Sequence, residues 1–390
     1  MKNIFKNRFV HIAILLICAL FLRFFLESFI SDDYSFLIRM ASIIIILLFG
    51  GFFVLKGVAK VIEETTEVLS ERTKIASGLL QSLGTAFPDM VLGVVAAIVS
   101  LSLVKTDYPR AINFAIIAAA TTFGSNIYNI AHATWCVFRQ NIANKEEKNV
   151  LMFPYTKIGG HVIPMKNHKT KPSLPEIDTS VDILNTLTIL TAIVAISMVI
   201  FGQVATPPPN MKGDLYQLIR PVGGVVLLLC IVIMFYFRKS KREHIIEKEI
   251  EKEEKYYSKK STWLILTVLL ISGISILFTA ESMVKAVEAF CDITGLPFVI
   301  AGVLAGVIGC IGEMIVVHNF TVNPKGRIGD ALVGVAMDNI VTTMGASIVA
   351  VMGGIFLGGN ALILIFVIIL TLNAVLIWQI SKLKSYFLKT

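Results

Sequence analysis

The chain has 390 residues, of which 55% are hydrophobic and only 16% are charged. Soluble domains rarely have so apolar a composition, and many of the apolar residues form runs long enough to cross a bilayer. The sequence therefore predicts an integral membrane protein. The five cysteines are isolated and show neither a disulfide framework nor metal-ligand spacing between any pair of them.

Ten apolar runs are long enough for membrane-spanning helices, which need about 20 predominantly apolar residues each. They lie at about 9–30, 41–62, 73–103, 110–138, 181–202, 217–238, 262–289, 296–320, 329–352 and 360–380. The runs lack strand-like alternation, so an all-α integral membrane protein is predicted rather than a β-barrel. The first run resembles a signal peptide but has no small-residue cleavage site, and we expect it to remain as a membrane helix.

The basic residues indicate how the spans are oriented. They concentrate in residues 2–8, 139–171, 238–260 and 382–389. With ten spans, all four segments fall on the side of the N-terminus, and an excess of Lys and Arg marks the cytoplasmic side. Both termini are therefore predicted to be cytoplasmic, and the formal net charge of +8 reflects this bias rather than nucleic-acid binding. Residues 318–327, which contain Asn-Pro and Gly, are predicted to form a cytoplasmic turn.

Two segments of the chain align without gaps. Residues 53–63 (FVLKGVAKVIE) and 278–288 (FTAESMVKAVE) share Phe, Lys, an aliphatic residue and Glu in register. Asp89 follows the first segment by 26 residues, and Glu313 follows the second by 25. Five spans, an odd number, separate the two starts, so the two copies lie upside-down relative to each other. Many secondary transporters contain such inverted repeats, with broken helices forming a binding site near the midplane.

The repeat divides the chain into four parts. An extra N-terminal membrane helix occupies 1–40, and the first repeat, with five helices, occupies 41–238. A charged cytoplasmic loop follows at 239–261, and the second repeat, with four helices, occupies 262–390. The predicted fold thus has about ten transmembrane helices in two inverted-topology repeats, with discontinuous helices at the midplane.

Three acidic residues, Asp89, Glu313 and Asp338, lie inside stretches that otherwise read as membrane-embedded helix. A carboxylate at a helix centre raises the free energy of insertion by about 2.5–3.5 kcal/mol. Acids placed at such positions usually face a polar cavity and bind ions or protons. These three residues are therefore the first candidates for a cation site.

Two motifs in the first repeat resemble those of a known family. The segments Gly84–Asp89 (GTAFPD) and Gly124–Asn129 (GSNIYN) resemble the first signature repeat of the calcium/cation antiporter superfamily, which includes sodium/calcium and proton/calcium exchangers. The resemblance covers about 41–380; it is strong over 76–132 and weaker over 296–347. It implies a ten-helix inverted-repeat carrier in which acids from both repeats coordinate the transported cation.

The residues of the first motif favour oxygen ligation on a deformable helix. Pro88 has no amide hydrogen, so the carbonyl of Gly84 loses its helical partner, and we expect the helix to unwind there. The freed carbonyl, the Thr85 hydroxyl and the Asp89 carboxylate then share one face, because residues 85 and 89 are one turn apart. Hard oxygen donors suit Ca²⁺, or Na⁺ by similar chemistry. The alternative is that Pro88 only kinks the helix and a neighbouring residue satisfies Asp89.

Polar residues of the second motif extend this candidate site. Ser125 and Asn129 are spaced one turn apart, and Asn126 flanks the same face. Their match to the family motif assigns them to the site; the alternative is that they join two helices, at about 0.6 kcal/mol per hydrogen bond. His132 lies one turn further on and is interpreted as a core histidine, with a proton relay as the alternative.

The second copy keeps an acid but departs from the family pattern. Glu313 lacks the expected Thr, Ser and Pro before it. At the second motif this copy has Asp338 and Asn339, and it has Thr342 where the family often carries Asp or Asn. We expect Asp338, one turn before Thr342 on the same face, to supply the missing negative charge.

The sequence predicts a secondary active transporter that exchanges a cation, Ca²⁺ or another divalent ion, for Na⁺ or H⁺ by alternating access around buried carboxylates. A passive cation channel that uses the same acids is the alternative. An intramembrane aspartyl protease is rejected, because the chain has neither a Tyr-Asp pair nor a Gly-x-Gly-Asp motif. The expected partners are inorganic cations and the lipid bilayer, without a cofactor, nucleic acid or enzymatic activity; no oligomeric state is predicted.

Overall fold

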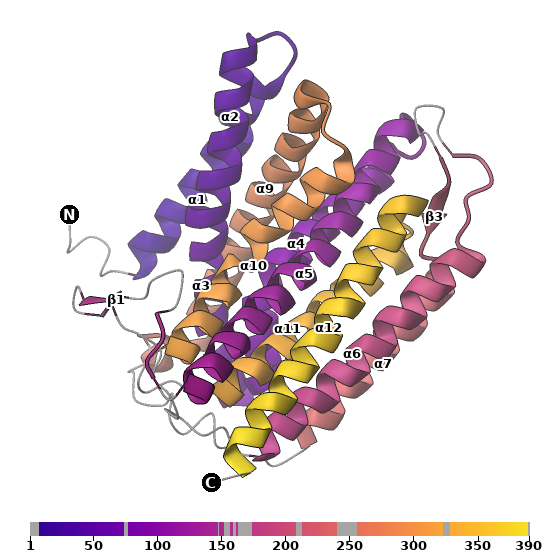
Figure 1. The fold of residues 1–390 in the computed structure, drawn as a ribbon. Coiled ribbons are helices and arrows are strands. Elements are labelled where there is room, and N and C mark those ends of the chain that lie inside the picture. Colours follow the sequence, from indigo (N-terminus) through magenta and orange to yellow (C-terminus); the bar gives the residue numbers. More distant parts are fainter. Residues whose placement is uncertain are drawn as a thin grey trace.

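Long helices that run alongside one another dominate the protein (Figure 1). The computed structural model describes residues 8–73, 77–146, 148–151, 157–158, 161–162, 174–207, 213–239, 256–322 and 328–388. The predominance of helices confirms the predicted all-α fold class of a membrane protein.

The helices follow one another with short connections. In chain order they are α1 (Arg8–Phe24), the 3₁₀ helix η1 (Leu26–Ile30), α2 (Phe36–Phe49), the π-helical η2 (Gly50–Leu55), α3 (Lys56–Thr73), α4 (Ser77–Leu103), α5 (Tyr108–Glu146), α6 (Leu174–Phe201), α7 (Arg220–Lys239), the 3₁₀ helix η3 (Tyr256–Lys259), α9 (Thr262–Thr294), α10 (Phe298–Val322), α11 (Ile328–Met352) and α12 (Gly359–Leu388). Short strands form two antiparallel pairs, β1 (Lys157–Ile158) with β2 (His161–Val162) and β3 (Leu215–Gln217) with β4 (Phe356–Gly358).

Many of these helices have the length and composition of membrane spans. Seven segments of the described chain are long and apolar enough to cross a membrane, namely Arg8–Ile30, Phe36–Ile62, Tyr108–Glu146, Ile177–Phe201, Thr262–Thr294, Leu332–Met352 and Gly359–Ser385. Three shorter apolar helices are Met90–Leu103, Arg220–Tyr236 and Phe298–Cys310. Large apolar side chains such as Ile17, Leu228 and Leu270 are exposed on the bundle. Such a surface fits lipid tails, which are as apolar as leucine.

Four helices, α4, α5, α10 and α11, form the centre of the bundle and contact one another in every pairing. On one flank, α1 and α2 pack against α9, and on the other, α6 and α7 pack against α11 (Figure 1). α12 packs against both α5 and α6. The polar residues predicted from the two motifs and from the second copy therefore belong to the four central helices.

Glycines allow α5 and α10 to approach closely. A Cβ added at Gly306 of α10 would lie 2.8 Å from the Ser125 nitrogen and 2.8 Å from the Thr121 carbonyl oxygen of α5. On the other helix, a Cβ added at Gly124 would lie 2.8 Å from the Cα of Val303. Helices in a membrane associate largely through such van der Waals contacts, which only small residues permit at this distance.

The helix break predicted at Gly84–Pro88 is absent. α4 is helical from Ser77 to Leu103, with Pro88 inside it. A proline removes one backbone hydrogen bond and kinks a helix, but the turns on both sides can remain helical. Here the turn beyond Pro88 is held by tertiary contacts, since Met90 lies directly against Gly345 of α11.

A departure from α-helical geometry occurs instead at Gly50–Leu55, where a π-helical turn joins α2 to α3. A Cβ added at Gly51 would lie 1.9 Å from Cγ2 of Ile308 in α10, and one added at Gly50 would lie 3.3 Å from Leu22 in α1. The turn thus lets the α2–α3 segment contact two neighbouring helices at once. Such single-turn π-bulges are often found at functional sites.

The turn predicted at residues 318–327 begins later than expected. α10 continues through His318 and ends at Val322, and the Thr321 hydroxyl donates to the Val317 carbonyl within it. Residues 323–327 lie outside the described part of the chain. A proline disfavours helical backbone in the residue before it, so Asn-Pro at 323–324 limits α10 only from residue 323 onward.

Replacing Gly306 by Ala is expected to destabilise the protein, because the new methyl group meets backbone atoms of α5 that cannot rotate away. Overpacking of this kind costs about 1–3 kcal/mol. The measurement is thermal unfolding of the purified protein in detergent. Gly273→Ala in α9 is the matched control, since an added Cβ there has no neighbour within 4 Å among the described residues. Equal melting temperatures for the two variants would contradict the close α5–α10 packing.

Candidate functional site

A carboxylate from one half of the chain meets an amide from the other half at the centre of the bundle. Glu313 of α10 is 2% exposed, and its Oε2 accepts a hydrogen bond from Nδ2 of Asn129 in α5. Asn129 is itself buried. Asn129 is the last residue of the second motif, and Glu313 is the acid of the second copy. The sequence predicted them as separate site residues, and they lie in direct contact.

The two acids of the second half lie at the same depth. α10 ends at Val322 and α11 begins at Ile328, so these helix ends lie on the same face of the bundle. Glu313 is about 14 Å along α10 from this face and Asp338 is about 15 Å along α11, at a rise of about 1.5 Å per residue. Half of a bilayer's hydrocarbon thickness is about 15 Å. Both carboxyl groups therefore lie about midway through the bundle, and Asp338 is only 7% exposed.

Other predicted site residues lie buried on the two helices beside Glu313. They are Ser125 and Asn126 on α5 and Asn339 and Thr342 on α11. The two hydroxyl groups donate to backbone carbonyls of their own helices, Ser125 to Thr122 at 3.0 Å and Thr342 to Asp338 at 2.9 Å. Their oxygens keep lone pairs that can accept a hydrogen bond or ligate a cation.

Several amide groups in this region have unused hydrogen-bonding capacity. The Oδ1 atoms of Asn126, Asn129 and Asn339, and Nδ2 of Asn339, are buried and have no hydrogen-bond partner among the described residues. Buried polar groups in proteins are normally satisfied, so these amide groups are suited to bind a water or an ion. Three amide oxygens together with two carboxylates form a set of hard oxygen donors, which is the ligand chemistry of Ca²⁺.

The first motif lies on α4, beside this set. The side chains of its predicted ligands lie outside the described part of the chain; these residues are Gly84, Thr85 and Asp89. The α4 backbone, however, passes against both α5 and α11, because Gly93 lies next to the Thr122 hydroxyl and Met90 lies next to Gly345. Asp89 directly precedes Met90, so its position in the chain is adjacent to the α4–α11 contact.

Three other acids, Glu27, Glu281 and Glu288, are held in ion pairs. Lys285 of α9 donates to Glu27 and to Glu281 at 2.9 Å each, and Arg23 pairs with the same two carboxylates. Glu288 pairs with an arginine of α5. These acids join α1 and η1 to α9 and α9 to α5. Their charges are compensated within the protein by these basic partners.

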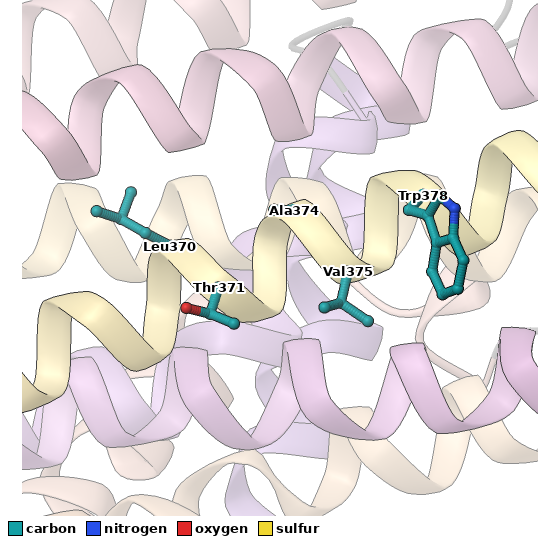
Figure 2. A pocket seen from close by; sticks show the side chains of 5 residues that line it. All are labelled: Leu370, Thr371, Ala374, Val375 and Trp378. Carbon is teal, nitrogen blue, oxygen red and sulfur yellow. The ribbon is translucent and has the colours of Figure 1, made fainter.

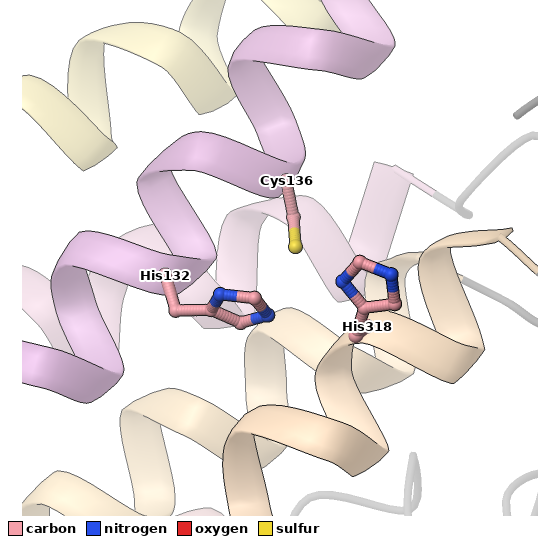
Figure 3. Close-up of side chains that lie close together, drawn as sticks. All are labelled: His132, Cys136 and His318. Carbon is pink, nitrogen blue, oxygen red and sulfur yellow. The ribbon is translucent and has the colours of Figure 1, made fainter. Parts of the chain in front are cut away.

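A second polar cluster was missed by the sequence analysis. His132 and Cys136 of α5 and His318 of α10 place one ligand atom each within 4.8 Å of the others, and Figure 3 shows the cysteine sulfur beside both rings. The sequence contained a partial signal, because His132 and Cys136 are spaced one helical turn apart. Only the packing of α10 against α5 shows that His318 joins them.

The surface groove in Figure 2 is a different kind of feature. Its lining residues all belong to α12 and are Leu370, Thr371, Ala374, Val375 and Trp378. The groove has no ionisable side chain, and Trp378 is 53% exposed. An apolar groove on one outer helix fits lipid contact rather than cation binding.

The fold is similar to two solved structures. One is the H⁺/Ca²⁺ exchanger CAX, at 13% sequence identity and a TM-score of 0.54, with 97% of each chain covered. The other is native YfkE, at 11% identity and a TM-score of 0.52, with coverage of 97% of this chain and 96% of that one. No protein-family model and no curated protein matches the sequence. The resemblance to calcium/cation antiporters that the motifs predicted is thus confirmed at the level of the fold.

Replacing Glu313 by Gln is expected to abolish the thermal stabilisation of the purified protein by Ca²⁺. The substitution keeps the size of the side chain but removes a charged ligand. A ligand at about 100 times its Kd stabilises a folded protein by about 2.7 kcal/mol, which a melting curve with and without Ca²⁺ detects. Glu281→Gln is the control, because that carboxylate pairs with Arg23 and Lys285. A stabilisation by Ca²⁺ that is equal in the two variants would exclude Glu313 as a ligand.

Proposed function

We propose that the protein is a secondary active antiporter that exchanges Ca²⁺ or another divalent cation for H⁺ or Na⁺, and that it is not an enzyme. The observation that carries this proposal is the contact between Glu313 and Asn129. It joins the acid of the second half to the motif of the first half inside a fold shared with an H⁺/Ca²⁺ exchanger. The unsatisfied amide oxygens on α5 and α11, the helices that pack against α10, support a polyoxygen cation site.

The proposed architecture is a pair of inverted repeats, 41–238 and 262–390, preceded by an extra helix in 1–40. The helix contacts support this division, because they recur in both halves. α3 packs on α4 as α9 packs on α10, α4 packs on α5 as α10 packs on α11, and α5 packs on α12 as α11 packs on α6. In this arrangement the seven long apolar segments and the three shorter apolar helices give ten spans, with the basic segments and both termini in the cytoplasm.

The mechanism follows from the charge of the site. Asp89, Glu313 and Asp338 together form an anionic site, and moving uncompensated charge through a low-dielectric barrier is strongly unfavourable. A divalent cation neutralises the carboxylates, as do protons or Na⁺ ions. Exchange results when the helices around the site rearrange between inward- and outward-facing states only with the charge neutralised.

Asp338 has a particular role in this mechanism. Its carboxyl is buried on α11 one turn before Thr342, whose hydroxyl donates to the Asp338 carbonyl. Thr342 brings no negative charge to the site. We assign the charge of this part of the site to Asp338, which completes the oxygen set contributed by α5 and α10.

Flux measurements in proteoliposomes test the proposed exchange. Vesicles that contain the purified protein and are loaded with Ca²⁺ are expected to release Ca²⁺ in a saturable manner when a proton or Na⁺ gradient is imposed. The same measurement with Mn²⁺ or Mg²⁺ in place of Ca²⁺ identifies which divalent ions are exchanged. A Ca²⁺ flux that is independent of both gradients would contradict antiport and indicate a passive channel.

Replacing Asp338 by Asn is expected to reduce exchange at limiting Ca²⁺ by at least about tenfold, equivalent to about 1.4 kcal/mol, because the site loses one negative charge. The measurement is the initial exchange rate as a function of Ca²⁺ concentration. Asp178→Asn on α6 is the control, since that acid is half-exposed and pairs with Lys384. An unchanged cation dependence in Asp338→Asn would exclude the assigned role.

A further inference from the structure

Three metal-ligating side chains converge between α5 and α10, toward the helix end at Val322. The ligand atoms of His132, Cys136 and His318 lie within 4.8 Å of one another. The two imidazole rings are 5.5 Å apart between centroids and nearly parallel, with an angle of 26° between their planes. In Figure 3 a ring nitrogen of each histidine is directed toward the other residues of the cluster.

The backbone of α5 prepares two of the ligands. His132 and Cys136 are one turn apart, so both side chains leave the same face of the helix. Pairs of ligands with this spacing bind zinc on helices in other proteins. His318 is supplied by α10, whose distance from α5 is fixed by the glycine contacts about two to four turns away along the same interface.

The orientation of His132 is suited to metal binding. Its Nε2 atom is buried and has no hydrogen-bond partner among the described residues. Its ring also forms a hydrogen bond with the backbone of Met314, which must therefore involve the other nitrogen, Nδ1. Metal-bound histidines typically donate their second ring nitrogen to such a carbonyl, which fixes the ring and leaves the remaining lone pair for the metal.

The cysteine is also held in place. Cys136 is buried, and its side chain forms a hydrogen bond with that of Thr321 on α10. In a tetrahedral site with bond lengths of about 2.0–2.3 Å, the ligand atoms are about 3.5 Å apart. Atoms within 4.8 Å reach that spacing by moving about 1 Å or less toward the centre, which small side-chain rotations allow.

We propose that His132, Cys136 and His318 form a binding site for a transition-metal ion of the Zn²⁺ class. Two imidazole nitrogens and a thiolate match the donors that zinc prefers, and a fourth position remains for water. Binding requires the Cys136 thiol to release its proton to solvent as the sulfur–metal bond forms. The ion links α5 to α10.

This site differs in chemistry from the oxygen-rich site around Glu313. Calcium selects hard oxygen ligands, whereas the nitrogen and sulfur donors of the cluster select softer ions. The inference therefore does not depend on the proposed exchange activity. The two sites use separate side chains, and substitutions can address each one alone.

Cobalt binding tests the proposal directly, because Co²⁺ takes the place of Zn²⁺ and absorbs light. The full-length protein, purified in detergent and treated with a chelator, is titrated with Co²⁺. We expect one Co²⁺ per chain, with a thiolate-to-cobalt charge-transfer band and the visible bands of tetrahedral cobalt, and we expect Zn²⁺ to bleach both. Zn²⁺ alone is also expected to raise the melting temperature, since it joins two helices.

Variants identify the ligands. Cys136→Ser is expected to lose the charge-transfer band, whereas the control Cys230→Ser, which alters a buried cysteine of α7, keeps it. His318→Gln removes the ligand of α10 and is expected to lose the Zn²⁺-dependent rise in melting temperature, which keeps the test valid if Cys136→Ser does not fold. Glu313→Gln is expected to retain both signals even where it loses exchange.

Three results would overturn the proposal. The first is a wild-type protein without the charge-transfer band. The second is a band that persists in a folded Cys136→Ser variant. The third is a Co²⁺ signal that disappears in Glu313→Gln, because the bound metal would then be held by the oxygen ligands rather than by this cluster.

Discussion

The close approach of α5 and α10 is the constraint on which the centre of this protein depends. Helices in lipid gain little hydrophobic free energy by packing together, so contact between them must come from closely fitted surfaces and a few polar bonds. Gly124 and Gly306 bring the two backbones within van der Waals contact. Only at that separation can the short side chain of Asn129 reach Glu313, and a larger residue at either glycine would move the two apart.

The polar groups gathered by this packing do not satisfy one another fully. An amide hydrogen bond from Asn129 stabilises the buried carboxylate of Glu313, but three amide oxygens on α5 and α11 have no donor among the described residues. In a low-dielectric interior such groups are costly, whereas a cation with six to eight oxygen ligands uses all of them at once. The same arrangement that is unfavourable when empty therefore favours binding. This difference between the empty and loaded states is what a carrier needs to couple occupancy to movement.

The sequence predicted the features that depend on local pattern. The apolar runs predicted the helices, and the positions of Glu313 and Asp338 within those runs predicted that both acids are buried near mid-depth. The sequence-based prediction was wrong where tertiary contacts determine the local backbone geometry or bring side chains together. The break expected at Pro88 is absent, and the turn that follows the proline is packed against α11 through Met90. The irregular turn lies instead at Gly50–Leu55, where adjacent glycines meet other helices. The sequence pattern places His318 in a turn, so its approach to His132 follows only from the packing of α10 against α5.

The interface between α5 and α10 changes in donor chemistry along its length. Near mid-depth the helices present amide and carboxylate oxygens, and toward the Val322 end they present two imidazoles and a thiol. Hard ions prefer the oxygen donors near mid-depth, and softer ions prefer the nitrogen and sulfur donors toward Val322. His132 follows Asn129 by less than one turn on the same helix. Under the two proposed assignments, an ion bound at one position would therefore constrain the helix that forms the other, and the separation of donor types along this interface would let the two positions select different ions.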